Sequence, residues 1–178
     1  MKKYVLIAAT AVTASVMAAA PAVAHVAPVE RGAAAAAAEP AAPIRIVAPG
    51  ERVHAAAGVR LWLTEEGKHW STPDGGENFR SVVDGNLDMS RPGISHQSEG
   101  LGEKREFHSG VYYGTKDAAR AELTDRDGRT TAVRFVQLPG GPGWGAWYIT
   151  TPRTEGGHSI TLYDSRGRVL AELPRFDF

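Results

Sequence analysis

Hydrophobic and polar residues alternate in short segments along much of the chain after residue 58, and glycine-rich turns separate these segments. Such alternation is typical of half-buried β-strands, because successive side chains of a strand point to opposite faces. Residues 59–63 show it clearly, since Val59, Leu61 and Leu63 fall on one face. The pattern predicts strands at 59–63, 119–124, 131–137, 146–150, 159–163 and 169–172. We expect no helix of three turns or more among them.

Two segments of matching sequence predict two β-hairpins. Residues 124–129 read Thr-Asp-Arg-Asp-Gly-Arg, and residues 163–168 read Tyr-Asp-Ser-Arg-Gly-Arg. In each segment, alternating residues lead into an Asp-x-x-Gly-Arg turn, and β-branched or aliphatic residues follow. Glycine accepts the positive φ that such turns require. We therefore expect positive φ at Gly128 and at Gly167.

The first of these turns also begins like a calcium-binding loop, because Asp125, Asp127 and Gly128 follow the pattern Asp-x-Asp-Gly. Calcium takes six to eight oxygen ligands, so a calcium loop continues with further acidic or amide side chains. Here Arg129 and two threonines follow instead. The sequence favours a plain glycine turn in which an aspartate caps the bend.

These strands and turns predict an all-β fold, either a single antiparallel β-sandwich of immunoglobulin-like architecture or an open barrel, in a domain spanning residues 58–178. The pattern weakens at 84–104, where glycine, proline and serine are frequent. We expect a long irregular connection there, with brief strand pairing around residues 94–96.

The amino terminus has the three parts of a secretory signal peptide. Lys2 and Lys3 supply positive charge, residues 4–20 form an apolar run, and Ala22 and Ala24 are the small residues that leader peptidases require. The run is alanine-rich, is short for a membrane span, and is followed by Pro21. We therefore predict cleavage after Ala24 (signal peptide 1–24) and a secreted, extracellular protein.

Residues 25–57 are predicted to form a disordered spacer rich in alanine and proline. Six consecutive alanines at 33–38 favour a helix, but so short a run is marginal in water, and four prolines interrupt the segment. It holds few large side chains to bury. Only residues 44–47 could form a fragment of strand.

Composition narrows the possible partners. The chain contains no cysteine, which excludes disulfide bonds, so the domain depends on its apolar core. Without Lys2 and Lys3, 18 of the 20 basic residues remain against 20 acidic ones, and they form no basic run. This charge balance argues against nucleic acid or a membrane as the partner. We expect a monomer that binds an extracellular protein or a cell-wall glycan.

The sequence contains no short motif for catalysis or metal binding, so we expect no cofactor. It lacks H-E-x-x-H and G-x-S-x-G, and its histidines are widely spaced. A secreted hydrolase would need a dispersed site that only the fold could assemble. The candidates for such a site are His69, Ser95, His96, His108 and His158. Three of these residues and the acidic residues would have to converge in one pocket.

Aromatic residues are the candidate ligand contacts. Trp144 is flanked by Gly143 and Gly145 in the loop 139–145, and Trp147 and Tyr148 follow it. Aromatic rings at such positions often contact sugars or protein partners. Alternatively, Trp144 folds back and covers the sheet.

Cleavage after Ala24 would make His25 the mature amino terminus, with an amine and an imidazole in one residue. Together with a second imidazole from the fold, this pair could hold copper, which favours nitrogen ligands. The arrangement resembles the copper brace of polysaccharide oxygenases and the site of periplasmic copper carriers. In those proteins the first residue packs against the domain, whereas here an alanine-rich segment intervenes.

Two further resemblances concern the fold. Residues 109–114, Ser-Gly-Val-Tyr-Tyr-Gly, resemble the strand-F signature of immunoglobulin variable domains, although Gly114 replaces the cysteine. The leader, the spacer, the segments Gly-Val-Tyr-Tyr-Gly and Gly-Ala-Trp-Tyr and the ending Leu-Tyr-Asp-Ser-Arg-Gly-Arg-Val resemble small exported proteins of high-GC Gram-positive bacteria. This resemblance implies export and a β-rich domain, but no particular activity. The leading expectation is a secreted, non-catalytic binding module.

Overall fold

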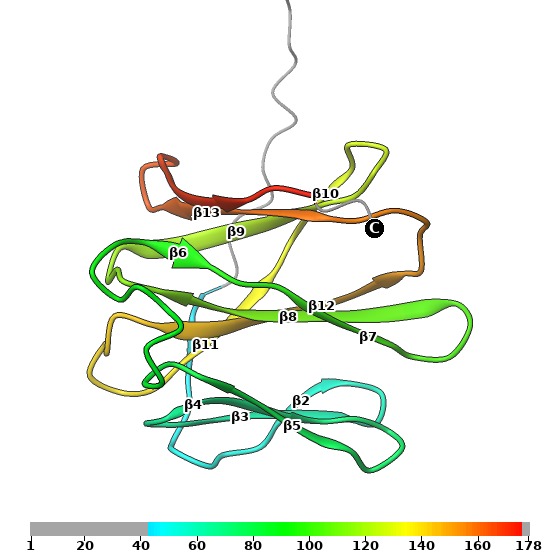
Figure 1. Ribbon diagram of the computed structural model, residues 1–178, viewed down its shortest axis with the longest axis horizontal. Helices are drawn as coiled ribbons and strands as arrows, with labels where there is room; N and C mark the ends of the chain where they lie inside the picture. Colours follow the sequence, from blue (N-terminus) through cyan, green and yellow to red (C-terminus); the bar gives the residue numbers. More distant parts are fainter. Residues whose placement is uncertain (1–42, 176–178) are drawn as a thin grey trace, which may run out of the picture. The chain divides into compact units, whose positions relative to one another are not determined.

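The computed structural model describes residues 43–175, which form fourteen β-strands and no helix (Figure 1). The strands make three open sheets, which we call A, B and C, and the predicted all-β, sandwich-like fold is confirmed. The predicted signal peptide, most of the predicted spacer, His25 and residues 176–178 lie outside the described residues.

Sheet A lies between the other two sheets in Figure 1. All its neighbouring strands are antiparallel except β1 and β11, which run parallel. Its strands, in spatial order, are β1 (Arg45–Ile46), β11 (Arg134–Gln137), β12 (Gly145–Pro152), β8 (Arg105–Tyr113) and β6 (Gly93–Ile94), and β7 (Gln97–Gly100) also pairs with β8.

The two outer sheets are antiparallel and have four strands each. Sheet B consists of β2 (Val53–Ala56), β3 (Val59–Thr64), β4 (Gly67–Ser71) and β5 (Glu77–Ser81). Sheet C consists, in spatial order, of β10 (Thr130–Ala132), β9 (Ala118–Thr124), β13 (Ser159–Asp164) and β14 (Val169–Leu173).

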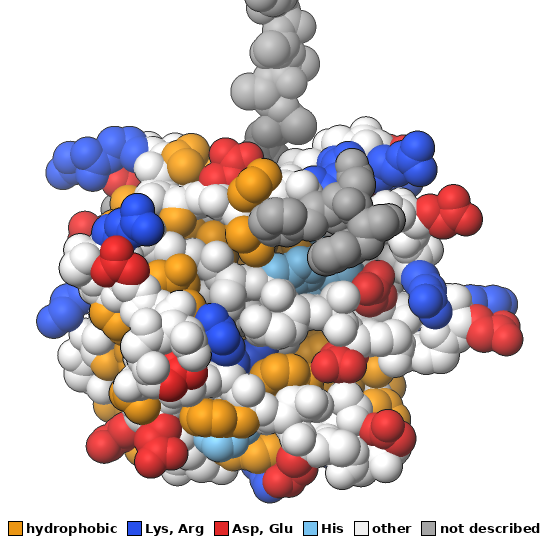
Figure 2. All heavy atoms as spheres, in the orientation of Figure 1, with side chains coloured by type: hydrophobic (Ala, Val, Ile, Leu, Met, Phe, Trp, Pro, Cys, Tyr) orange, Lys and Arg blue, Asp and Glu red, His pale blue; other side chains and the backbone are white. Residues whose placement is uncertain are grey.

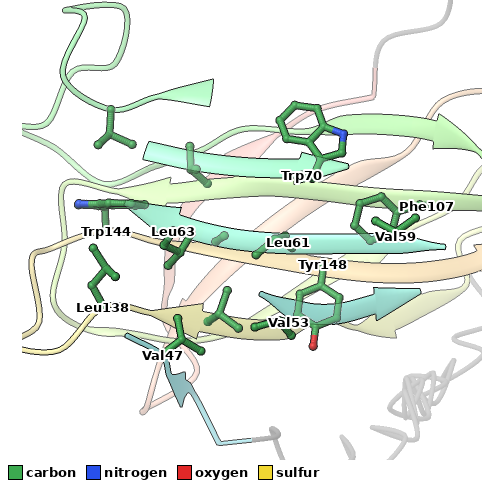
Figure 3. Close-up of a cluster of buried hydrophobic side chains, with 14 of the residues drawn as sticks. Val47, Val53, Val59, Leu61, Leu63, Trp70, Phe107, Leu138, Trp144 and Tyr148 are labelled. Atoms are coloured by element: carbon green, nitrogen blue, oxygen red, sulfur yellow. The ribbon is translucent and has the colours of Figure 1, made fainter. Parts of the chain in front are cut away.

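Two separate hydrophobic cores hold the three sheets together. The core between sheets A and B contains Leu61, Phe107 and Tyr148 (Figure 3), and the core between sheets A and C contains Trp147 and Leu162. Alternate residues of β8 and β12 therefore supply opposite cores. Burying each large apolar side chain stabilises the fold by roughly 1.5–3 kcal/mol.

The predicted strand at 131–137 is wrong in one respect, because two strands in two sheets replace it. β10 pairs with β9 in sheet C, and β11 pairs with β12 in sheet A. Val133 lies at the crossing, buried, and its backbone N–H donates to the carbonyl of Ala121. The alternation of side chains continues across this position, so the pattern alone does not reveal the change of sheet.

The strands begin before residue 58, where the predicted domain starts. β1 and β2 lie within 25–57, the segment that the sequence analysis assigned to the spacer, and Val47 and Val53 are both 1% exposed. The expected strand fragment at 44–47 is present, and it pairs with β11. The alanines and prolines around these valines dilute the strand pattern, whereas burial against sheet A determines their structure.

Both predicted hairpins are confirmed, as β9–β10 and β13–β14. Gly128 has φ 79° and Gly167 has φ 78°. In the first turn, Oδ1 of Asp125 accepts hydrogen bonds of 2.9 Å from two backbone N–H groups, and Oδ1 of Asp164 does the same at 2.9 and 2.8 Å. These aspartates cap their turns, as the plain-turn interpretation predicts.

Replacing Gly128 or Gly167 by valine is expected to lower the free energy of unfolding by on the order of 1–2 kcal/mol, because a β-branched residue resists positive φ. No other group lies within 4 Å of a Cβ built at either glycine, so the cost is conformational. The exposed Asp127→Asn variant should lose much less. Thermal melts of the three variants, with calcium and with chelator, measure this ranking.

The same melts test the calcium-loop alternative. If wild-type protein melts several degrees higher in calcium and Asp127→Asn abolishes that rise, Asp125 and Asp127 are calcium ligands and the plain-turn interpretation is wrong.

Candidate functional site

Three histidines that are far apart in sequence meet between sheets A and C. His96 precedes β7, His108 lies in β8, and His158 directly precedes β13. Their ring centroids are 5.2 Å apart for His96 and His108, 4.5 Å for His108 and His158, and 6.3 Å for His96 and His158. We call these residues the histidine cluster. In Figure 2, histidine side chains reach the surface of this face of the molecule in two places.

Hydrogen bonds fix the central ring of the histidine cluster. Nδ1 of His108 lies 3.0 Å from Nε2 of His96, and Nε2 of His108 lies 2.9 Å from the hydroxyl oxygen of Thr151. Nε2 of His158 is 3.5 Å from the hydroxyl of Thr154, and His96 also stacks on the indole of Trp147. The strand pairing of β8 with β12 therefore positions both the rings and a hydroxyl partner.

Two histidines of the cluster, His96 and His108, favour the neutral form. Burial, followed by the positive charge that a neighbouring histidine would carry, lowers the pKa of His96 and of His108 from 6.5 to about 4. The carboxylate of Glu106 approaches the histidine cluster, and its Oε2 lies 3.8 Å from Nε2 of His108. Neutral imidazoles keep a lone pair on one ring nitrogen, which can accept a proton or bind a metal ion.

As the side chains stand, no three histidine, cysteine, aspartate or glutamate residues within 43–175 are arranged to hold a metal ion. His96 and His108 direct their ring nitrogens at each other. Their lone pairs therefore do not converge on a common point in this arrangement.

A buried lysine lies between sheets A and B. Lys68 on β4 is 0% exposed, and its Nζ donates to Oε1 of Gln97 at 2.8 Å and to the hydroxyl of Ser109 at 2.7 Å. The ammonium group also lies 4.0 Å from the centroid of the Trp70 ring. Burial lowers the pKa of Lys68 well below 10.5, and the negative charge of Glu99 opposes this shift only in part.

A cleft of about 820 Å³ opens between sheets A and B, and we call it the A–B cleft. Apolar and charged residues line it from several elements. They include Ala55 of β2, Asp74 of the β4–β5 turn, Leu101 and Arg105 of the β7–β8 hairpin, Arg134 of β11 and Tyr148 of β12. Arg134 and Tyr148 are cross-strand partners, so their side chains lie on the same face of sheet A.

The charged residues that line the A–B cleft differ in whether they already have a hydrogen-bonding partner in the protein. Asp74 accepts hydrogen bonds from Thr72 and from the backbone of Gly76, and Glu99 accepts one from the indole N–H of Trp70. Neither arginine of the lining makes a side-chain hydrogen bond or a salt bridge to another residue of the described chain. The A–B cleft therefore offers two guanidinium groups to a ligand, while its carboxylates already have protein partners.

The three aromatic residues proposed as ligand contacts differ in position. Trp144 and Trp147 are 5% and 0% exposed, Trp144 in the core between sheets A and B and Trp147 in the core between sheets A and C. The burial of Trp144 favours the alternative in which it folds back over the sheet. Tyr148 packs in the core between sheets A and B (Figure 3), and it also lines the A–B cleft.

The fold brings together some members of the dispersed set and separates others. His96, His108 and His158 meet, whereas His69 stacks between Trp62 and Phe79 of sheet B. The Ser95 hydroxyl accepts a hydrogen bond from the backbone of Val111. The hydrogen bonds of the described residues include none between the Ser95 hydroxyl and a ring of the histidine cluster.

Sequence reasoning did not select Lys68, Arg105, Arg134 or Ser109. One signal was available for Lys68, because it alternates with Trp70 and so shares the inward face of its strand. No local pattern distinguishes the two arginines from the other basic residues.

Comparison with known proteins adds no candidate, since no family model, curated protein or solved structure matches the chain. The described part of the chain also has no helix that could cross a membrane.

Proposed function

We propose that this chain is a secreted, non-catalytic binding module whose ligand binds in the A–B cleft and carries carboxylate groups. The supporting observation is the pair of arginines, Arg105 and Arg134, which line the cleft without a protein partner in the described chain. Export rests on the amino-terminal sequence alone.

Arginine suits this role because its planar guanidinium group binds a carboxylate through two parallel hydrogen bonds. Tyr148 and Leu101 add apolar surface beside the two cations. Ligand sites commonly combine such apolar walls with a few polar groups that fix orientation. A carboxylate-bearing segment of a cell-wall glycan and an acidic segment of an extracellular protein both offer this chemistry.

Binding experiments with the purified chain test the proposal. The ligands are oligosaccharides that contain uronic acids, peptides rich in aspartate and glutamate, and neutral oligosaccharides of the same length as controls. We expect one acidic class to bind and its affinity to fall with added salt, because exposed charges are screened. Arg134→Gln and Arg105→Gln should each reduce this affinity by about tenfold, which corresponds to roughly 1.4 kcal/mol.

Arg60→Gln is the matched control, because Arg60 is an exposed arginine of sheet B that does not line the cleft. It should leave the affinity unchanged. Equal losses in all three variants would indicate a non-specific charge effect, and binding that survives both cleft substitutions would place the ligand elsewhere. Turnover of a bound ligand would contradict the non-catalytic part of the proposal.

A secreted hydrolase is the second candidate, and the contact between Lys68 and Ser109 favours it. A lysine whose pKa is lowered can act as a general base, and the 2.7 Å distance from its Nζ to the serine hydroxyl suits proton transfer. Ser109, however, is only 1% exposed, so a substrate reaches it only if the sheets separate locally. Loss of esterase activity in Ser109→Ala, against retained activity in Ser98→Ala, would support this candidate.

A further inference from the structure

We propose that the ligand of the A–B cleft is an extended peptide segment of another protein, in which acidic and apolar residues alternate, and that it binds as an added strand along β12. This inference rests on the proposed function, because it names the partner of the same cleft. The added strand pairs with residues 149–152, where β12 has a strand partner on one side only. We call this stretch the open edge of β12.

The open edge arises because the neighbouring strand leaves sheet A early. Pairing of β12 with β11 ends at Tyr148, opposite Arg134, whereas pairing of β12 with β8 continues to Pro152. Val133 already belongs to the crossing between sheets A and C (Figure 1). Burial follows this change, since β12 is buried through Tyr148 and only half-buried at residues 149–151. Such an edge can pair with an incoming segment.

The backbone N–H and C=O of Thr150 point into the open edge. Those of Val111 bond to Ser95, which lies on the side of β8 away from β12. Successive residues of a strand direct these groups to opposite sides, so Val111 and its partner Ala146 exchange no backbone hydrogen bonds. The backbone groups of Ala146 therefore point toward β11. Two further steps of alternation, each of two residues, give the same direction at Thr150.

Pro152 supports this assignment, because its backbone groups point the same way as those of Thr150 and proline has no N–H to donate. Proline is accepted within a sheet where its nitrogen faces an edge, since no hydrogen bond between strands is lost there. The open edge therefore offers the N–H and C=O of Thr150 and the C=O of Pro152 to a bound peptide.

Space for the side chains of the peptide lies on both faces of the open edge. Thr150 lines the A–B cleft, and it also lines a second cavity of about 220 Å³, which we call the A–C cavity. Successive side chains of an added strand point to opposite faces of the sheet, so they enter the two spaces in turn. In strand addition, backbone hydrogen bonds supply affinity and such side-chain pockets supply specificity.

The A–B cleft suits acidic side chains of the peptide. Arg105 and Arg134 line it without a protein partner in the described chain. Arg134 is also the last β11 residue that pairs with β12 before the open edge. A peptide that continues the line of β11, antiparallel to β12, has a side chain on the same face two residues away from Arg134. A glutamate there can meet the guanidinium group.

The A–C cavity suits smaller, apolar side chains. Leu123 and Pro152 line it together with several threonines. Of its charged residues, Asp125 already caps the β9–β10 turn, and the Arg129 side chain is 77% exposed to solvent. The ring of His158, which also lines it, belongs to the histidine cluster. We therefore expect acidic residues to alternate with residues such as valine.

Calorimetric titration of the full chain with a synthetic peptide in which glutamate and valine alternate tests the inference. The matched control peptide has the same composition, with its glutamates in one block and its valines in another, so that length and charge are equal. We expect the alternating peptide to bind at least about tenfold more tightly than the block peptide.

Two N-methylated forms of the alternating peptide test the backbone pairing. The peptide residue opposite Thr150 exchanges hydrogen bonds with it and shares its face of the sheet, which is the A–B face of Tyr148. That residue is a glutamate. Methylation of every glutamate N–H should therefore abolish binding, whereas methylation of every valine N–H should not, because those groups point away from β12.

The chain offers a corresponding pair of variants. Thr150→Pro removes the N–H of the open edge and should weaken binding of the alternating peptide by about tenfold. Thr150→Ala keeps this N–H and should bind as tightly as the wild-type chain. Circular dichroism shows whether both variants are folded, and if Thr150→Pro does not fold, the two methylated peptides still decide the question.

Equal affinity for the alternating and block peptides, or equal effects of the two methylations, would overturn the inference. If neither peptide binds but an acidic oligosaccharide binds and depends on Arg105 and Arg134, the proposed function holds and strand addition is wrong. If no acidic ligand of either class binds, both proposals are wrong.

Discussion

Replacing Gly110 by alanine is expected to destabilise the fold by at least about 3 kcal/mol, a large part of the stability of an ordinary domain. Gly110 lies in the middle of β8, where the indole of Trp147 crosses over it and donates a hydrogen bond of 2.9 Å to the carbonyl of Ser95. A Cβ at this position would overlap with that carbonyl oxygen and lie 2.7 Å from Cε2 of Trp147. The oxygen belongs to the backbone, so relief would require the connection between β6 and β7 to move.

Chemical denaturation followed by tryptophan fluorescence measures this effect, and the soluble yield reports variants that do not fold. Gly128→Ala is the matched control, because Gly128 has φ 79° and no neighbouring group within 4 Å of an added Cβ. It should cost only the conformational penalty, about 1 kcal/mol. A Gly110→Ala protein that is as stable as this control would show that β8 and the Trp147 ring do not approach as closely as described.

The stability of the wild-type protein, measured relative to Lys68→Met, is expected to increase as the pH rises toward 10.5, the ordinary pKa of lysine. Burial holds the pKa of Lys68 below 10.5 in the folded state, whereas the unfolded chain keeps the ordinary value. Between these two pKa values the unfolded state binds more protons, so stability increases as the pH rises, with a slope of at most about 1.4 kcal/mol per pH unit. Above the unfolded pKa the difference becomes constant.

Urea unfolding of both proteins at a series of pH values gives the difference directly, and other titrating groups cancel. Methionine fills similar space without a charge, so the comparison isolates the ammonium group of Lys68. Lys104→Met, which removes an exposed lysine of the β7–β8 turn, should follow the wild-type curve. Parallel curves for wild type and Lys68→Met would mean that Lys68 keeps its proton in the folded state.

The sequence by itself determined the features that depend on neighbouring residues. The alternation of apolar side chains located β3, β9, β12, β13 and β14, because successive side chains of a strand point to opposite faces of its sheet. The repeated Asp-x-x-Gly-Arg motif located both hairpins, because the aspartate cap and the positive φ of Gly128 and Gly167 are local requirements.

Only the tertiary structure decided which sheet each strand joins. The chain crosses from sheet C to sheet A at Val133 without a break in the alternation. The short strands β1 and β2 form in an alanine- and proline-rich segment because Val47 and Val53 bury their side chains against the A–B core. Such burial depends on residues nearly a hundred positions away, as in the pairing of β1 with β11.

For the candidate sites too, the sequence supplied the residue types, and the tertiary structure decided which residues meet. Sequence reasoning named His96, His108 and His158 as residues that would have to converge, but nothing in their spacing shows that they do. Their meeting depends on the pairing of β8 with β12 in sheet A and on the position of His158 directly before β13 of sheet C. The burial of Lys68 likewise results from the stacking of sheet B on sheet A. A site made from separate strands is fixed by packing between sheets, which local patterns do not encode.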